Sequence, residues 1–203
     1  MGNLPPEAGI RVPADVLQKL VHQLFIGGGM RDEDALTMAQ LLVATDLRGV
    51  VSHGTQQTLG YVRMMLEGRV NPQPEIQVTS SRGATRVYDG DGGMGHLPSI
   101  QAARFVAATA QEQGLAAATT GNHFHFGGAG KYSRLAAEAG CVGISVSSHR
   151  WERQGMILSA ANGASPISIA FPSRDQPPLV LDMASSFIGW DEQMFDNAPF
   201  LYF

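Results

Sequence analysis

The sequence predicts an α/β protein in which a helical N-terminal subdomain precedes a non-Rossmann α/β domain with a mixed or antiparallel sheet. Three observations support this fold class. Apolar residues recur at helical spacing as far as about residue 66, apolar and polar residues alternate from residue 76, and later apolar strand-like runs are interspersed with helical segments. We place the boundary after the NPQP segment, giving a helical subdomain at 1–72 and an α/β cofactor-binding domain at 73–203.

The N-terminal subdomain is expected to contain three helices. The first is predicted over residues 13–26 and stops at three consecutive glycines. The second is predicted to begin with Asp32 as its N-cap and to end near Gly49. The third is predicted from about Gly54 to Leu66. The first helix has an apolar face formed by Val16, Leu17, Leu20, Val21, Leu24 and Phe25.

The second part of the chain is expected to mix strands and helices. Residues 76–81 and 85–92 alternate and are joined at Arg82-Gly83, which predicts a β-hairpin. A helix is then predicted from about Leu97 to Gln113. The remaining predictions, in chain order, are a strand at 114–120, a helix at 130–140, and strands at 141–148, 166–172 and 177–183.

Composition and charge exclude several classes of protein. A formal net charge of −4 with scattered basic residues argues against a nucleic-acid partner. The first twenty residues contain proline and acidic residues where a signal peptide would be apolar, and no apolar run reaches membrane-spanning length, so we expect a cytoplasmic protein without a membrane partner. The single cysteine, Cys141, cannot form an internal disulfide and is interpreted as a small buried hydrophobe.

The segment from Asp46 to Gly54 presents a histidine beside a hydroxyl where the chain leaves one helix and turns. The pKa of a free histidine lies near neutrality, so His53 could exchange a proton with a substrate during carbonyl reduction or alcohol oxidation. In the competing interpretation Ser52 caps the next helix and His53 merely occupies its first turn.

The glycine-rich segment from Gly121 to Gly130 follows a predicted strand and precedes a predicted helix, which is where α/β folds place ligands. His123 and His125 alternate, so only one of them can face a given pocket. Two histidines without a nearby cysteine or carboxylate do not make a metal site, so no metal is expected. A glycine-rich loop with solvent-facing histidines remains an alternative.

Two further segments are candidate cofactor sites. Residues 90–95 fit G-x-G-x-x-G, but the preceding strand belongs to the predicted hairpin, and the acidic residue expected about twenty positions later is not convincing. A Rossmann unit is therefore not favoured. Asp182 ends an apolar strand, where it could orient a histidine or accept hydrogen bonds from a ribose. It could equally cap a helix beginning at Ala184.

Taken in order, several segments resemble the malate/L-lactate dehydrogenase type 2 family. They are DLRGVVSHG, GRVNPQPEI, GHLPSIQAA, NHFHFGGAGKY, GASPISIAFP and PPLVLDMASS, and the resemblance covers about residues 13–188. It implies a non-Rossmann α/β fold, NAD- or NADP-dependent hydride transfer at a small 2-hydroxy or 2-oxo acid, and a homodimer.

The resemblance also implies roles for individual residues. The catalytic group comprises His53 as proton donor, with Ser52 beside it, and His125 as a second acid/base or orienting group. Tyr61 matches a residue on the substrate side. The cofactor contacts would come from His149, Asp182, Met183 and Ala184.

The chain also departs from the family pattern. Family members often carry an arginine three residues after the glycine of the SHG turn, where it suits a substrate carboxylate, but this chain has Gln57. Either Arg48 or another cation takes over its role, or the substrate lacks the usual carboxylate geometry. Family members continue beyond the length of this chain, so we expect a C-terminal truncation that leaves apolar strand edges uncovered. The alternative function is therefore a non-catalytic remnant or interaction module with the same fold.

Overall fold

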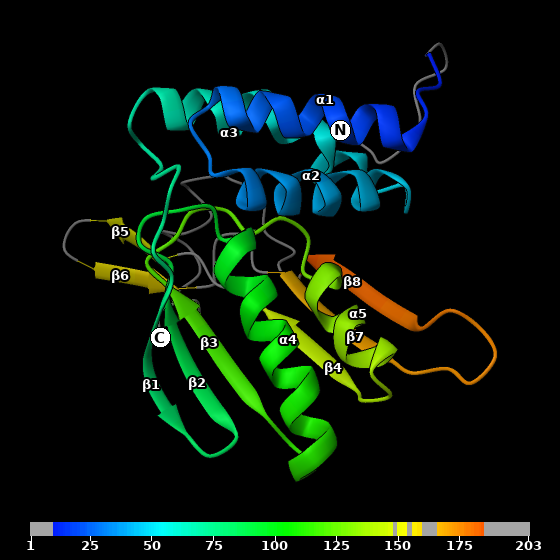
Figure 1. Ribbon diagram of the computed structural model, residues 1–203. Helices are drawn as coiled ribbons and strands as arrows, with labels where there is room; N and C mark the ends of the chain where they lie inside the picture. Colours follow the sequence, from blue (N-terminus) through cyan, green and yellow to red (C-terminus); the bar gives the residue numbers. More distant parts are fainter. Residues whose placement is uncertain (1–9, 148–149, 154–155, 160–165, 185–203) are drawn as a thin grey trace, which may run out of the picture.

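The computed structural model describes residues 10–147, 150–153, 156–159 and 166–184, and it confirms the predicted fold class (Figure 1). Helices α1 (Ala14–Gly27), α2 (Asp32–Asp46) and α3 (Thr58–Leu66) form a layer above a part that mixes helices and small sheets. No helix in the described ranges is both long and apolar enough to cross a membrane.

Two predicted helix starts are wrong in detail. Arg31, not Asp32, is the N-cap of α2, and Asp32 is instead the first helical residue. The third helix begins at Thr58 rather than Gly54, because the chain first passes through two 3-10 turns, η1 (Val51–His53) and η2 (Thr55–Gln57). These turns place the Ser52-His53 pair between two α-helices and not inside one.

The helical layer has a continuous apolar core that it shares with the start of helix α4 (His96–Gln113). Phe25 from α1 and Met38 from α2 are fully buried, and Met65 from α3 packs in the same cluster. Met94, just before α4, and Leu97, in its first turn, enter this cluster. The N-terminal end of α4 is thereby fixed against the helical layer.

The first sheet confirms the predicted hairpin and adds a parallel strand. Strands β1 (Gln77–Arg82) and β2 (Thr85–Asp89) are antiparallel, and β2 pairs in parallel with β3 (Ala117–Gly121) after the chain crosses over through α4. Because β1 occupies the other edge of β2, the G-x-G-x-x-G segment at 90–95 does not lead into a sheet of successive parallel strands. The expectation of a non-Rossmann fold is met.

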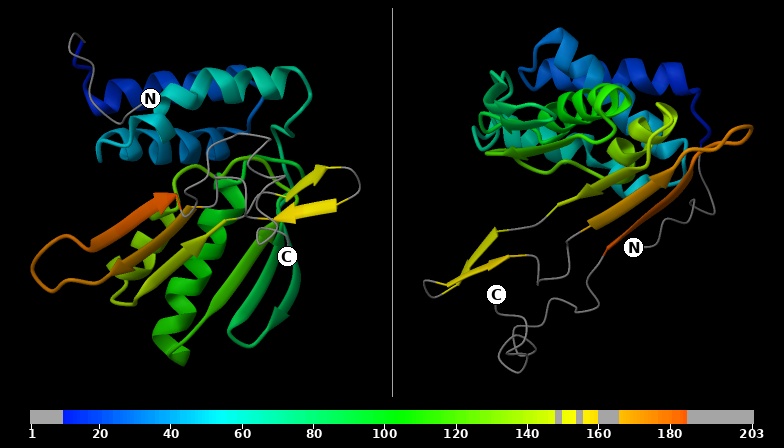
Figure 2. Two further views of the ribbon diagram at one scale, coloured as in Figure 1. Left: turned by 180° about the vertical axis from the view of Figure 1, so that it is seen from behind. Right: turned by 90° about the horizontal axis from the view of Figure 1, so that it is seen from below.

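The second sheet is antiparallel and has the order β4-β7-β8, with β4 at Gly143–Val146, β7 at Pro166–Phe171 and β8 at Leu179–Ala184. Helix α5 (Gly130–Glu138) packs on it, while α4 packs on the first sheet. Seen from behind, the strands lie in front of both helices (Figure 2). A further pair, β5 (Arg150–Arg153) and β6 (Met156–Ser159), was not predicted.

Small residues allow α5 to lie close to the second sheet. The hydroxyl groups of Ser133 and Ser168 are 2.7 Å apart in a buried hydrogen bond, and Ser168 also donates to the Leu181 carbonyl at 2.8 Å. A Cβ at Gly143 would lie 2.1 Å from the carbonyl oxygen of Ser133. The helix is therefore held at a distance that leaves no room for a side chain at position 143.

The opposite face of this sheet is apolar and uncovered by the described residues. The register places Ile144, Ile169 and Leu181 side by side across the three strands, and Val146, Ile167 and Met183 likewise. Ile144 and Val146 are 68% and 64% exposed, and Leu179 at the start of β8 is 72% exposed. Such a face is normally buried against another element.

We expect Gly143→Ala to destabilise the fold by about 1–3 kcal/mol, because a backbone atom of α5 cannot yield the space that the methyl group needs. Gly60→Ala is the matched control, since Gly60 lies in helix α3 with no atom within 4 Å of its Cβ position, and there alanine should stabilise by about 0.5–1 kcal/mol. Urea unfolding of both variants measures the two effects. Equal stability of the two variants would contradict the close packing of α5.

Candidate functional site

The turn that carries Ser52 and His53 is fixed by a carboxylate at the end of α2. Both carboxylate oxygens of Asp46 lie 3.2 Å from the backbone nitrogen of Thr55, which donates a hydrogen bond to them at the start of η2. A Cβ at Gly54 would lie 1.6 Å from Oδ1 of Asp46, so this contact requires glycine. The part-buried contact of the Asp46 carboxylate with Gly54 and Thr55 thus explains the Asp-x7-Gly-Thr spacing.

His53 is half-buried, and its ring is held by its neighbour in the turn. Oγ of Ser52 lies 2.9 Å from Nδ1 of His53. Ser52 is not the N-cap residue of η1, η2 or α3, and the residues that are make no side-chain cap hydrogen bond, so the alternative in which Ser52 caps the next helix is wrong. Burial lowers the pKa of His53, and the nearby ammonium group of Lys131 lowers it further, while Asp182 opposes the shift. At pH 7 His53 is therefore a neutral imidazole.

The ring of His125 lies beside that of His53, with 5.7 Å between their centroids. Oη of Tyr61, on α3, lies 2.6 Å from Nδ1 of His125. Burial raises the pKa of Tyr61 well above its usual value, so its hydroxyl stays protonated. If Tyr61 donates to Nδ1 of His125, that imidazole carries its proton on Nε2, whereas the hydrogen bond between Ser52 and His53 can run in either direction.

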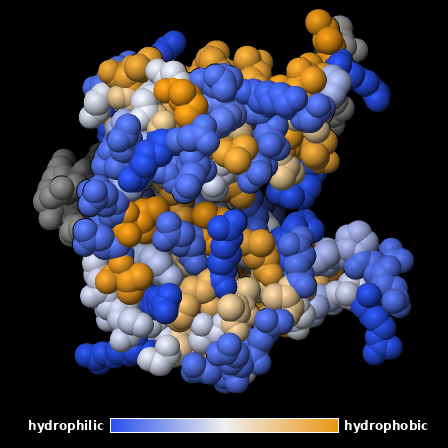
Figure 3. Space-filling model, in the orientation of Figure 1, coloured by the Kyte–Doolittle hydropathy of each residue, from blue (hydrophilic) through white to orange (hydrophobic). Residues whose placement is uncertain are grey.

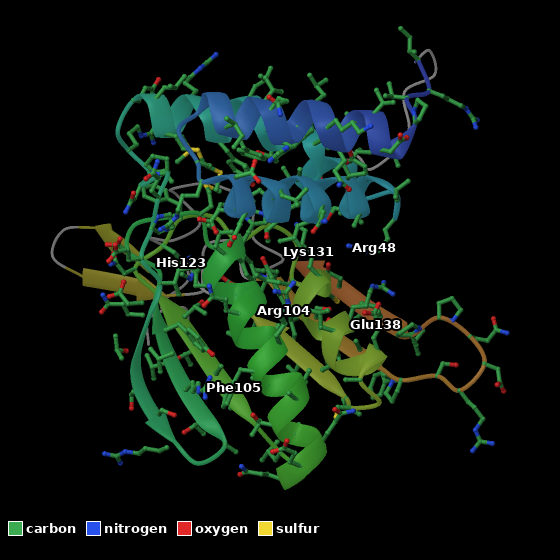
Figure 4. All side chains as sticks on the ribbon, viewed as in Figure 1. Arg48, Arg104, Phe105, His123, Lys131 and Glu138 are labelled. Atoms are coloured by element: carbon green, nitrogen blue, oxygen red, sulfur yellow. The ribbon has the colours of Figure 1, made fainter. Side chains whose placement is uncertain are left out.

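The two neighbouring histidines of the glycine-rich loop diverge, as the alternation predicted. Nε2 of His123 lies 2.8 Å from the Thr120 hydroxyl, and its Nδ1 lies 2.7 Å from the carbonyl oxygen of Phe124. Figure 4 shows His123 on the side of the molecule away from Lys131. Only His125 therefore joins His53.

Sequence reasoning missed His96, which lies behind the pair. It is fully buried at the first position of α4, with its ring 5.7 Å from Tyr61 and 6.3 Å from His125. Burial, reinforced by Lys131 and His125, lowers its pKa well below the usual value. The available signal was its place directly after the glycines at 90–95, at the predicted start of a helix.

Lys131 is the second residue that sequence reasoning missed. It is 6% exposed, and its Nζ lies 3.5 Å from the carbonyl oxygen of His53. A Cβ at Gly127 would lie 2.4 Å from this Nζ and 2.6 Å from Nε2 of His96. Burial and the neighbouring Arg48 lower the pKa of Lys131 to about 8, while Asp182 and Asp46 oppose the shift. The signal was a lone lysine in an otherwise small and apolar stretch.

A polar pocket of about 250 Å³ adjoins this cluster. Its lining includes Arg48, Lys131, Arg134 and Asp182, and Figure 4 shows Arg48 and Lys131 next to each other between the helical layer and α5. In the space-filling view a hollow bordered by hydrophilic residues separates these two parts (Figure 3). A larger pocket of about 530 Å³ at the start of α2 contains none of the predicted site residues.

Asp182 fixes the start of α5 from a distant strand. Its Oδ2 accepts a hydrogen bond from the backbone nitrogen of Gly130 at 2.9 Å, and a Cβ at Gly130 would lie 2.6 Å from the same oxygen. It therefore caps α5 rather than a helix beginning at Ala184, which is itself the last residue of β8.

The remaining predicted site residues differ in their surroundings. The amide of Gln57 donates to the carbonyl of Ser52 at 2.7 Å, so it supports the turn. Arg48 is exposed at the mouth of the pocket. Met183 points to the sheet face opposite Asp182, because side chains alternate along a strand, whereas Ala184 shares the face of Asp182. His149 lies outside the described residues. Within these residues, no group of three or more histidine, cysteine or acidic side chains could hold a metal ion.

Comparison with known proteins gives one consistent result. The family model described as malate/L-lactate dehydrogenase matches residues 12–194. Malate dehydrogenase of Pyrococcus horikoshii is 34% identical over 184 residues, which are 88% of this chain and 50% of that protein. L-sulfolactate dehydrogenase of Methanocaldococcus jannaschii is 33% identical, over 91% of this chain and 52% of that protein. The chain thus spans about half the length of these curated relatives.

Solved structures agree with the sequence comparison. The structure of malate dehydrogenase from Pyrococcus horikoshii superposes with a TM-score of 0.78 at 36% identity, covering 89% of this chain and 52% of that one. A delta1-piperideine-2-carboxylate reductase from Pseudomonas syringae has a TM-score of 0.77 at 22% identity, which shows a shared fold.

We expect the pKa of His53 to respond in opposite directions to two substitutions. Lys131→Met removes a positive charge and should raise the pKa toward 6.5, whereas Asp182→Asn removes a negative charge and should lower it further. NMR titration of the histidine Cε1 protons measures both shifts. Movement of both pKa values in one direction would contradict the arrangement of charges around His53.

Burial of His96 in its neutral form should make the protein sensitive to acid. Below about pH 6.5 His96 binds a proton in the unfolded chain but stays neutral in the native state. The free energy of unfolding therefore decreases as the pH is lowered, by at most about 1.4 kcal/mol per pH unit. His96→Gln removes this contribution, so urea unfolding between pH 7 and pH 5 should show a smaller loss of stability in the variant. An unchanged loss would show that His96 takes up a proton in the native state.

Proposed function

Because the chain belongs to the malate/L-lactate dehydrogenase family, we propose that it binds a nicotinamide cofactor and catalyses hydride transfer at C2 of a 2-hydroxy or 2-oxo acid. The observation that carries the proposal is the pair of His53 and His125, with ring centroids 5.7 Å apart and a hydroxyl group beside each Nδ1. Such a pair suits a reaction in which a substrate oxygen gains or loses a proton.

We assign His53 as the group that exchanges this proton. It is neutral at pH 7 because of burial and the charge of Lys131, and Ser52 orients its ring. When Nδ1–H of His53 donates to Ser52, the unprotonated Nε2 can accept the proton of the C2 hydroxyl group during oxidation, and the imidazolium so formed can return that proton to the C2 oxygen during reduction. His125, held by Tyr61, is assigned the task of orienting the same oxygen. Both assignments agree with the sequence-based predictions.

The described residues fit one end of a nicotinamide cofactor. Asp182 is an exposed carboxylate at the polar pocket, where it can accept a hydrogen bond from a ribose hydroxyl or a carboxamide besides the one from Gly130. A volume of about 250 Å³ admits a small acid or a single ring, but not a whole dinucleotide. When bound, the nicotinamide would accept or supply the hydride.

The finer features stay proposals that rest on the family resemblance. They are the contacts of the cofactor with Asp182, Met183 and Ala184, the use of NAD or NADP, a homodimer, and a cytoplasmic location. Malate and L-sulfolactate appear in the names of the relatives, and both are 2-hydroxy acids with a second acidic group. We propose screening such acids first.

Replacement of His53 should separate chemistry from cofactor binding. We expect His53→Gln to lower kcat at least about 100-fold, since general acid–base catalysis contributes about 10²–10⁴-fold, while the affinity for NADH or NADPH changes little. His123→Gln is the matched control, because His123 lies on the same loop but bonds to Thr120 and Phe124. Turnover of 2-oxo acids is followed by the loss of NADH absorbance, and cofactor binding by fluorescence.

Two outcomes would contradict the proposal at different levels. Equal turnover by the parent chain and His53→Gln would remove His53 from the chemistry. A folded parent chain that binds neither NADH nor NADPH would favour the alternative of a non-catalytic remnant or interaction module.

A further inference from the structure

Three cations surround the polar pocket beside His53, and none of them forms an ion pair with another described residue. Lys131 is almost fully buried, Arg134 has a buried Nε without a hydrogen-bond partner in the described ranges, and Arg48 lies at the mouth. The ion pairs found within 4.0 Å involve other residues. Lys131 and Arg134 therefore keep donors available for an anion.

The pocket carries more positive than negative charge. Asp46 accepts the backbone N–H of Thr55, and Asp182 accepts that of Gly130. Of the residues that line the pocket, Asp182 is the one carboxylate, against the three cations. Asp182 and Asp46 offset the charge of Lys131 only in part, and a buried charge that is not fully compensated is costly, so the pocket suits a small anionic group.

We propose that Lys131 is a specificity-determining residue that binds the carboxylate of the 2-oxo or 2-hydroxy acid, assisted by Arg134. This inference rests on the proposed function. The carboxylate carbon of such an acid is bonded directly to C2, so the cation that binds it must lie next to the group that protonates the C2 oxygen. Lys131 meets this requirement, because its Nζ is 3.5 Å from the carbonyl oxygen of His53 and its charge lowers the pKa of the His53 imidazole.

A phosphate of the cofactor is the competing source of negative charge. It is separated from the reactive ring of the nicotinamide by a ribose, so it has no need to lie beside His53. The small volume of the pocket, about 250 Å³, also favours a small acid over a pyrophosphate with its attached sugars. The geometry therefore favours the carboxylate.

The charge on Lys131 provides a direct readout that does not depend on catalysis. Arg48, Asp182, Asp46, His53 and His96 are the titratable groups around its ammonium group, and its pKa is lowered to about 8. A bound carboxylate favours the charged form and should raise this pKa. Lys19 and Lys131 are the two lysines of the chain, so ¹⁵N-lysine NMR resolves them and exposed Lys19 serves as an internal control.

The test uses the full chain with oxalate as the probe and ADP-ribose as the phosphate-containing comparison, each with and without NADH. We expect oxalate to raise the pKa of Lys131 by at least about one unit and to leave that of Lys19 unchanged. Lys131→Met should weaken oxalate binding, measured by calorimetry, at least about tenfold. Lys131→Arg should retain binding, while Lys19→Met should behave like the parent.

Thermal melting tests whether the Lys131→Met variant folds like the parent. Lys131→Met removes a buried charge without a paired anion, so its melting temperature should equal or exceed that of the parent in the absence of oxalate. Oxalate should raise the melting temperature of the parent more than that of Lys131→Met.

The proposal is overturned if oxalate leaves the pKa of Lys131 unchanged, if Lys131→Met binds oxalate as tightly as the parent, or if only ADP-ribose shifts the Lys131 signal. Failure of the proposed function looks different. If the chain binds neither NADH nor NADPH but oxalate still raises the pKa of Lys131, the anion site stands without the dehydrogenase activity. If the cofactor binds and oxalate does not, the anion site alone is wrong.

Discussion

Hydrogen bonds from backbone N–H groups to two aspartates hold the candidate site together. Asp46 accepts the N–H of Thr55 at the start of a 3-10 turn, and Asp182 accepts the N–H of Gly130 at the start of α5. Each carboxylate lies where a helical turn presents unpaired N–H groups and a partial positive charge. The first bond fixes the turn that carries His53, and the second fixes the helix that carries Lys131.

Burial of charge and of polar groups gives the site its chemical character. His53 and His96 are kept neutral by burial and by the ammonium group of Lys131, while Lys131 itself is only partly compensated by Asp182 and Asp46. This arrangement costs stability, because apolar groups of similar size would cost less in the same place. Ionisable groups that are kept in such unfavourable surroundings are typical of functional sites. A buried cation can bind an anion and a neutral imidazole can bind a proton, and both properties are consistent with the proposed reaction on a 2-oxo acid.

The two faces of the second sheet differ in the size and polarity of their side chains. Gly143, Ser168 and Ala170 face α5 and are small, which permits the close approach that positions α5 and therefore Lys131. The other face carries Ile144, Val146 and Leu181, which are between 49% and 68% exposed against the described residues. The chain spans about half the length of its curated relatives. This face is an exposed apolar surface that no described residue covers, and such surfaces are usually buried against another element.

The sequence by itself predicted most of the elements and named His53 and His125 as candidate site residues. Periodicity located α1, α2, α4 and the β1–β2 hairpin because helices and strands impose local repeats of 3.6 and 2 residues. Alternation also separated His123 from His125. The start of α3 was misplaced, and β5 and β6 were missed, because 3-10 turns and short strands leave little periodic signal. Only the tertiary structure brought Lys131 to His53, placed His96 beside Tyr61, and assigned Asp182 to the start of α5. These contacts join residues that are 35 to 78 positions apart in sequence. The burial of His96 and Lys131 likewise depends on residues distant in sequence, so no local sequence pattern encodes it.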